Sequence, residues 1–189
     1  MKFGLRNTSF VYPNGTRNIW EDTEAHIQRA ERDGFDSFWV MDHFYQLPMH
    51  GSTKEPFLDA WTILPALAAV TNRIRLGAMV SPVGYRNPAL LARMASSLDH
   101  ISGGWMNFGF GAGGFKPEYQ AYGFEFIEKA SIRLDQMKEA LQLILGLWTN
   151  QCFTFHGKYF HVENTILEPK PLQKPYPPIL IGGSDQRSR

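Results

Sequence analysis

The strongest constraint on the fold is a regular alternation of short apolar runs, typical of β-strands, with helical patterns. The alternation indicates right-handed βαβ units and a parallel sheet. The first four strand-like runs begin about 30–37 residues apart, and at that spacing a closed eight-stranded barrel needs about 250 residues. The 189-residue chain has room for five such strands. It is therefore either an open α/β sheet or the N-terminal part of a TIM-type barrel. The expected strands cover 2–10, 37–41, 74–80, 105–111 and 179–183, and the expected helices 18–33, 59–71, 87–101 and 128–148.

Two further segments have clear patterns. The helix at 128–148 has apolar residues at steps of three or four, which predicts core packing rather than chemistry. The segment 153–162 predicts a hairpin that turns at His156-Gly157, with His156 and His161 on the surface.

Composition excludes several classes of protein. Apolar residues make up 43% of the chain and charged residues 20%, which is too apolar for a disordered segment. A formal net charge of +1 provides no field for nucleic acid. The single cysteine, Cys152, cannot form an intramolecular disulfide, and no apolar run approaches the roughly 18 residues of a membrane span. We expect one cytoplasmic domain over 1–189, with no membrane partner.

Asp42 and His43 stand side by side directly after the apolar run at 37–41. An imidazole can exchange a proton near neutral pH, so His43 is a candidate acid–base residue and Asp42 a candidate to orient it. The alternative is a buried packing histidine beside an aspartate that caps a turn. We expect no metal here, because no second histidine or acid follows at ligand spacing.

The glycine cluster GFGAGG at 109–114 follows the fourth strand. Its G-x-G-x-x-G spacing suits a dinucleotide, but that fold needs a long helix at once and an acid after the next strand. Pro117 interrupts the helix that should begin directly after the glycines. The acid at the right distance, Asp135, lies inside the expected helix at 128–148 and does not follow a strand. Glycines at a strand end still let a flat ligand approach the backbone closely, although a tight turn without a ligand is the alternative.

Four segments occur together in a characteristic order: MDHF (41–44), LGAMVSPVGYRNPALLARM (76–94), GFGAGGFKPEYQAYGF (109–124) and PKPLQKPYPPILIGG (169–183). In this combination the chain resembles the bacterial luciferase-like superfamily of flavin and deazaflavin oxidoreductases. It is most similar to the branch that uses the deazaflavin coenzyme F420. The resemblance implies a TIM (β/α)8-type barrel, of which this chain has the first five strands, with the active site at the carboxyl ends of the strands.

The resemblance also implies roles for individual residues. Asp42 would contact the deazaflavin, and His43 would donate or accept a proton. A cis peptide bond is expected at Met79–Val80. The remaining cofactor-binding positions would line the ring (Gly77, Met79, Val80, Ser81, Ala112 and Gly113) or hold the phosphate-bearing tail through backbone amides (Gly182 and Gly183).

The implied function is hydride transfer between coenzyme F420 and a small organic substrate that the sequence does not identify. The alternatives are an FMN-dependent monooxygenase and a shortened, non-catalytic flavin-binding paralogue. Oxidation of a sugar phosphate is disfavoured, because Gly114 and Leu47 replace the acid and the tryptophan of those enzymes. Glu118 would either stand near the ring or fix its loop, and Arg86 would reach a phosphate or, as we prefer, hold its own loop. The full-length form is expected to be a homodimer.

Overall fold

The structure is a computed structural model that describes residues 1–183, and it has an α/β fold. Its strands are β1 (Gly4–Asn7), β2 (Ser37–Val40), β3 (Arg75–Ala78), β4 (Ser81–Pro82), β5 (Phe108–Gly111), β6 (Phe153–His156), β7 (His161–Thr165) and β8 (Ile179–Gly182). Its helices are the 3-10 turn η1 (Thr16–Asn18), then α1 (Ile19–Arg32), α2 (Ala60–Ala69), α3 (Pro88–Ile101), α4 (Lys116–Ala121) and α5 (Ala130–Thr149).

Six of the strands within residues 1–183 form one parallel row in the order β1-β2-β3 followed by β4-β5-β8, and β6 and β7 form a separate antiparallel pair. The two halves are joined at Leu76, whose amide donates to the Trp105 carbonyl at 2.9 Å and whose carbonyl accepts from the Asn107 amide at 2.8 Å. The expected third strand is thus divided into β3 and β4. The division falls at Met79–Val80, whose peptide bond is cis as expected. Within residues 1–183 the row does not close, because β1 and β8 each pair on one side only.

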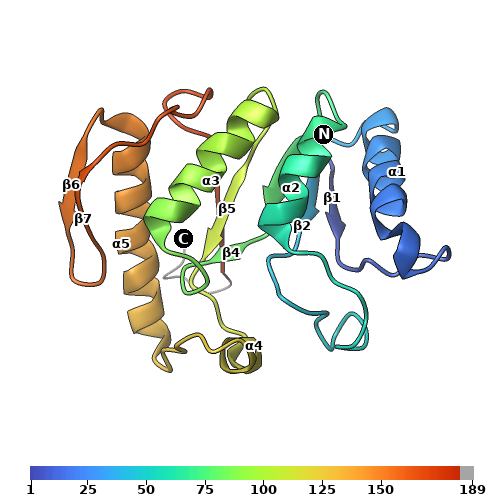
Figure 1. Ribbon diagram of the computed structural model, residues 1–189, viewed down its shortest axis with the longest axis horizontal. Helices are drawn as coiled ribbons and strands as arrows, with labels where there is room; N and C mark the ends of the chain where they lie inside the picture. Colours follow the sequence, from blue (N-terminus) through green and yellow to red (C-terminus); the bar gives the residue numbers. More distant parts are fainter. Residues whose placement is uncertain (184–189) are drawn as a thin grey trace.

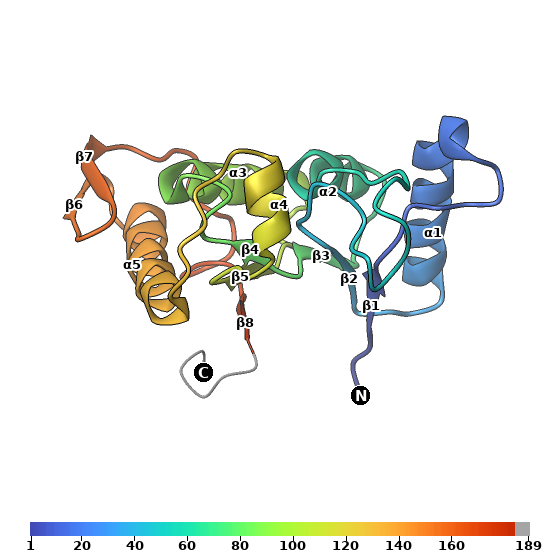
Figure 2. The ribbon, with the colours of Figure 1, turned by 90° about the horizontal axis from the view of Figure 1, so that it is seen from below.

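All four long helices lie on one side of this row. Figure 2 shows α1, α2, α3 and α5 around the outside of the curved strands, and none of the helices described within residues 1–183 lies on the inner side. The outward side chains of the strands, such as Phe38, Val40 and Phe108, are buried in the core that these helices cover. The apolar character of these outward side chains explains the helices on this side, because packing against them removes the side chains from water.

The helix boundaries follow local capping chemistry. Asn87 accepts hydrogen bonds from the amides of Ala89 and Leu90, and Pro88 occupies the first turn of α3. Asp59 caps α2 through the Thr62 amide at 2.8 Å. The predicted stripe on α5 packs on the core: Met137, Ile144 and Trp148 are buried, and Leu134 and Leu141 are half-buried against it. None of the helices within residues 1–183 combines the length and apolar character that a membrane crossing requires.

The predicted hairpin is β6–β7, and it packs beside α5 (Figure 1). The carboxylate of Glu139 on α5 accepts hydrogen bonds from three successive backbone amides of its turn, at 2.6–2.9 Å: Lys158, Tyr159 and Phe160. His156 and His161 are exposed, as expected.

The carboxyl ends of the strands carry the longest connections. Figure 1 shows the loop after β2 (residues 41–59) and the short helix α4 after β5 at the same end of the sheet. The pattern did not predict α4 as a separate element. Its length of six residues agrees with the expectation that Pro117 prevents a long helix directly after the glycines.

Candidate functional site

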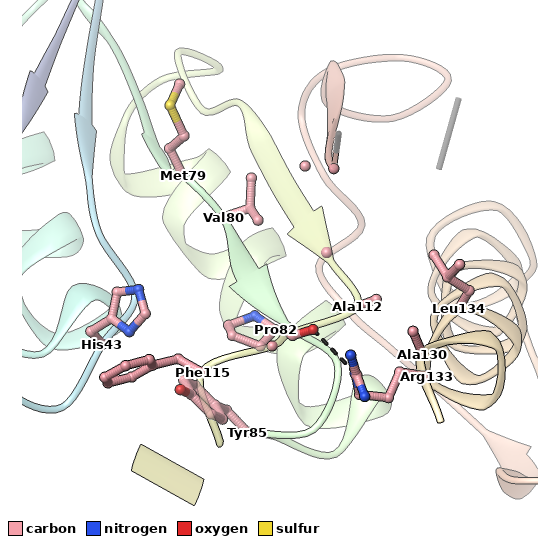
Figure 3. A pocket seen from close by; sticks show the side chains of 15 residues that line it. His43, Met79, Val80, Pro82, Tyr85, Ala112, Phe115, Ala130, Arg133 and Leu134 are labelled. Atoms are coloured by element: carbon pink, nitrogen blue, oxygen red, sulfur yellow. Dashed lines mark hydrogen bonds between the residues drawn. The ribbon is translucent and has the colours of Figure 1, made fainter. Parts of the chain in front are cut away.

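A cleft of about 480 Å³ lies at the carboxyl ends of the strands. Its walls come from the strand ends, the loop after β5 and the first turns of α5 (Figure 3). The lining residues are His43, Met79, Val80, Pro82, Tyr85, Gly111, Ala112, Gly113, Gly114, Phe115, Ala130, Arg133, Leu134, Gly182 and Gly183. The cleft therefore brings together seven residues of the predicted site, which are His43, Met79, Val80, Ala112, Gly113, Gly182 and Gly183.

Val80 explains why the neighbouring strand ends are glycine. A methyl group on Gly111 would lie 2.7 Å from Val80 Cγ2, and one on Gly182 would lie 2.5 Å from the same atom. The side chain of Val80 thus occupies the space that two Cβ atoms would need. The result is a floor made of one valine and bare backbone, across which a planar group can lie.

The loop after β5 is fastened to α5 by Arg133. Its Nε donates to the Gly113 carbonyl at 3.2 Å, as drawn in Figure 3, and its Nη1 donates to the Ile127 and Glu128 carbonyls at 2.5 and 3.0 Å. Gly113 has φ of +72°, a conformation that favours glycine. Arg133 thus holds the loop through backbone carbonyls, and the sequence alone did not reveal this role.

His43 points to the cleft from the end of β2, and its side chain is 21% exposed. Its Nδ1 lies 2.7 Å from Oε2 of Glu118, so the imidazole and the carboxylate are hydrogen-bonded. The ring of Phe115 stands edge-on to the imidazole at 6.2 Å between centroids. One edge of the imidazole therefore faces the cleft, and the other edge is hydrogen-bonded to a buried carboxylate.

Glu118, in α4, is completely buried, and its carboxylate has three hydrogen-bonding partners. Besides His43, the Tyr85 hydroxyl donates to Oε2, and the Phe44 amide donates to Oε1 at 2.5 Å. Burial alone would raise the pKa of this carboxyl, but the bonds from His43, Tyr85 and Phe44 outweigh burial and lower the pKa. The carboxylate is thus ionised and fixes its loop, which is the second of the two roles expected for Glu118.

Asp42 differs from the expectation, because it is fully buried and does not line the cleft. Its Oδ2 accepts from Arg86 Nη1 at 2.7 Å and from Trp61 Nε1 at 3.1 Å, which turns the carboxylate toward the helices. Oδ1 has no hydrogen-bond partner within the described residues. Burial raises the pKa of Asp42, and the Arg86 guanidinium opposes that rise. The Asp42 carboxylate thus supports the wall behind the cleft, and its expected contact with a ring stays a prediction.

Ser81 and Arg86 belong to the same buried network. Ser81 is buried behind the cleft, which it does not line, and it accepts from Trp61 Nε1 at 2.8 Å. Arg86 also pairs with Asp59 through Nη2 at 2.9 Å. With two carboxylates on its guanidinium, Arg86 is the loop-holding residue that we preferred, rather than a phosphate ligand.

The sequence-based reasoning missed the partners that come from distant segments. Tyr85 and Phe115 line the cleft, and Phe44 packs between Tyr85 and Tyr122 at 4.6 Å from each ring. The aromatic richness of 115–126 was the available signal, but the sequence does not show which rings meet.

Comparison with known proteins identifies relatives over nearly the whole chain. The sequence profile described as luciferase-like monooxygenase matches residues 1–189. The chain is 32% identical over 162 residues to an FMNH(2)-dependent dimethylsulfone monooxygenase of Pseudomonas putida, covering 86% of this chain and 43% of that protein. It is 33% identical over 164 residues to an F420-dependent glucose-6-phosphate dehydrogenase of Amycolatopsis mediterranei, covering 86% and 47%.

Solved structures agree in fold. An F420-dependent secondary alcohol dehydrogenase in complex with an F420-acetone adduct superposes with a TM-score of 0.80 and 26% identity, over 96% of this chain and 52% of that one. The monooxygenase RslO1 from Streptomyces bottropensis also gives a TM-score of 0.80, at 24% identity over 96% and 53%. The chain spans about half the length of the curated relatives that it matches. Because the family profile matches residues 1–189 and the identities to these relatives are 32% and 33%, the chain belongs to the luciferase-like monooxygenase family.

Proposed function

We propose that this chain forms the cofactor half of an oxidoreductase that transfers a hydride between coenzyme F420 and a small organic substrate. One observation carries the proposal: the cleft places the imidazole of His43 beside a glycine-lined floor that is shaped for a planar ring. The family as a whole supports an oxidoreductase, and the choice of F420 goes beyond it. F420-dependent relatives are similar to this chain at 33% and 26% identity.

The residues present fit a deazaflavin or flavin ring. Val80 fills the space above Gly111 and Gly182, so that no Cβ rises from the floor there, and no heavy atom stands within 4 Å of a Cβ at Gly114. We assign Met79, Val80, Ala112 and Gly113 to the ring and the amides of Gly182 and Gly183 to the phosphate-bearing tail. When bound, the deazaflavin would supply the hydride donor or acceptor.

In this proposal His43 is the residue that moves the proton. A hydride transfer at a carbon bearing oxygen leaves a proton to be taken up or supplied, and imidazole is suited to that exchange near neutral pH. Asp42 and Arg86 stabilise the wall from which His43 projects. For the longer protein we propose a closed (β/α)8 barrel and a homodimer, in which later strands would complete the substrate pocket.

An FMN-dependent monooxygenase is the second candidate. The 32% identity to the FMNH(2)-dependent dimethylsulfone monooxygenase favours it. The floor and His43 would serve an FMN ring equally, so the two candidates differ in cofactor rather than in this half of the site. A shortened paralogue that binds the cofactor without catalysis is the third.

Titration of the purified 189-residue chain tests the proposal. F420 and FMN are added in separate experiments and followed by absorbance and fluorescence, and size-exclusion chromatography reports the assembly state. Micromolar binding of F420 with much weaker binding of FMN is the expected result. Preference for FMN would replace the proposal by the monooxygenase. A folded chain that binds neither would contradict a cofactor site in this half.

A further inference from the structure

The proton on His43 can be placed from the hydrogen-bond partners of Glu118. Oε2 of Glu118 faces both His43 Nδ1 and the Tyr85 hydroxyl, while Oε1 faces the Phe44 amide. An ionised carboxylate has acceptors only, so each neighbour must supply a hydrogen. A tyrosine hydroxyl and a backbone amide can donate, and the imidazole can donate from Nδ1 only if the hydrogen is on that nitrogen.

We propose that Glu118 is a positioning residue that fixes the neutral imidazole of His43 as the Nδ1–H tautomer. The Nε2 lone pair is then available on the cleft side of the ring. When Nε2 takes up a proton from a substrate, the ring becomes a cation that remains hydrogen-bonded to the Glu118 carboxylate. The opposite charge stabilises that cation, because the carboxylate is fully buried and the imidazole is only 21% exposed, and Coulomb interactions in such surroundings are stronger than in water.

Glu118 is well placed for this role by its position in the fold. It is fully buried, and the same carboxylate binds the side chain of His43 and the backbone of Phe44. The imidazole is thus held both directly and through its own loop. The tautomer is a property of the chain itself, and only its use in proton transfer rests on the proposed function.

The Glu118→Gln variant gives a sharp test, because it keeps the shape and changes the donors. The Phe44 amide can only donate, so the glutamine carbonyl must take the place of Oε1. The glutamine NH₂ then takes the place of Oε2 and faces His43 Nδ1. A donor at that position requires a lone pair on Nδ1, and the ring hydrogen moves to Nε2.

The measurement is two-dimensional ¹H–¹⁵N NMR of the histidine rings, recorded at about pH 9, well above the ordinary pKa of a free imidazole. His43 signals are assigned by their loss in His43→Gln. The wild-type chain should show a protonated Nδ1 and an unprotonated Nε2, and Glu118→Gln should show the reverse. Wild-type His43 with hydrogen on Nε2, or a variant that folds and keeps Nδ1–H, would overturn the proposal.

Two controls accompany the spectrum. Tyr85→Phe removes the second donor on Oε2 but leaves the carboxylate, so Nδ1–H should persist. His100, whose Nε2 lies 2.8 Å from the Lys170 carbonyl, should keep its hydrogen on Nε2 in every variant. If Glu118→Gln does not fold, the wild-type spectrum alone still decides whether the Nδ1–H assignment stands.

Failure of the proposed function is distinguishable from failure of this inference. If the wild-type chain shows the Nδ1–H tautomer but binds neither F420 nor FMN, the cofactor assignment fails and the positioning role of Glu118 stands. If a cofactor binds and the tautomer is Nε2–H, the positioning role of Glu118 fails and the cofactor assignment stands.

Discussion

At the scale of single residues, Val80 and its glycine neighbours make the sharpest structural prediction. Gly111→Ala should push the valine into the cleft, because the new methyl would lie 2.7 Å from Val80 Cγ2. Overpacking of this kind costs about 1–3 kcal/mol. We expect a loss of that size in the free energy of unfolding, measured by urea denaturation, together with weaker cofactor binding in the titration.

A matched control and a rescue separate this effect from loss of glycine flexibility. Gly114→Ala, three residues further along the chain in the loop after β5, places its methyl where no atom stands within 4 Å, and should change stability little. In Val80→Ala/Gly111→Ala the atoms nearest to the new methyl are the Gly182 carbonyl oxygen at 3.6 Å and the Cβ of residue 80 at 3.9 Å, both ordinary van der Waals contacts. The double variant should recover most of the stability lost in Gly111→Ala. A Gly111→Ala chain as stable as Gly114→Ala would contradict the proposed clash.

Replacement of His43 tests its part in the reaction. In the longer protein, His43→Ala should lower kcat by roughly two orders of magnitude or more, as expected for loss of a proton-transfer group. The Kd of the cofactor should change little, because the floor of the cleft is unaltered. Stopped-flow reduction of the bound cofactor measures the change in turnover, and titration measures the Kd of the cofactor. An unchanged kcat would remove His43 from the mechanism.

At the scale of elements, the sequence predicts most of this fold, because periodicity reports which face is apolar. The four long helices and the β6–β7 hairpin form at the expected positions, and the strands do so with trimmed ends. Two local features were not predicted from the sequence pattern. The third strand is divided at Met79–Val80, and α4 forms after the glycines. Neither changes the apolar pattern, so neither leaves a periodic signal.

The bond between α5 and the hairpin predicts a dependence of stability on pH. Burial would raise the pKa of Glu139, but the amides of Tyr159, Phe160 and Lys158 outweigh it and lower the pKa. A lowered pKa in the folded state means that the contribution is present above the unfolded value of about 4.3 and is lost as the pH falls through the folded value. Glu139→Gln should therefore lower the free energy of unfolding by about 1–2 kcal/mol at pH 7.

The control for that variant lies one turn earlier on the same helix. Asp135 is exposed, and Asp135→Asn should leave the free energy of unfolding nearly unchanged at every pH. The difference between Glu139→Gln and wild type should begin to narrow as the pH falls below the unfolded pKa of about 4.3, and should vanish below the lowered folded pKa of Glu139. A difference that is the same at pH 3 and pH 7 would show that the carboxylate charge is irrelevant to the hairpin.

At the scale of the whole molecule, the site depends on contacts that no local pattern encodes. His43 and Glu118 are 75 residues apart, and Asp42 and Arg86 are 44 apart. The resemblance identified His43 and the floor residues, but the directions of Asp42 and Ser81 depend on where Arg86 and Trp61 lie after folding. Buried polar networks are assembled by the tertiary fold, so sequence could name their members without showing which of them face the cleft.

The uncovered inner face of the strand row makes the last prediction. Ile179 and Ile181 of β8 pack on the core, so the alternation of a strand turns Leu180 to the other face, where it is 37% exposed. Within the described residues, β1 and β8 also have one unpaired edge each, and unpaired edges favour association with another chain.

The isolated chain should therefore associate at micromolar concentrations in sedimentation velocity, and Leu180→Lys should shift it toward monomer by placing a charge on that face. Lys138, already charged and exposed on α5, offers the control substitution Lys138→Glu, which should leave association unchanged. A wild-type chain that stays monomeric and folded over the same range would show that the bare face and edges are stable in water.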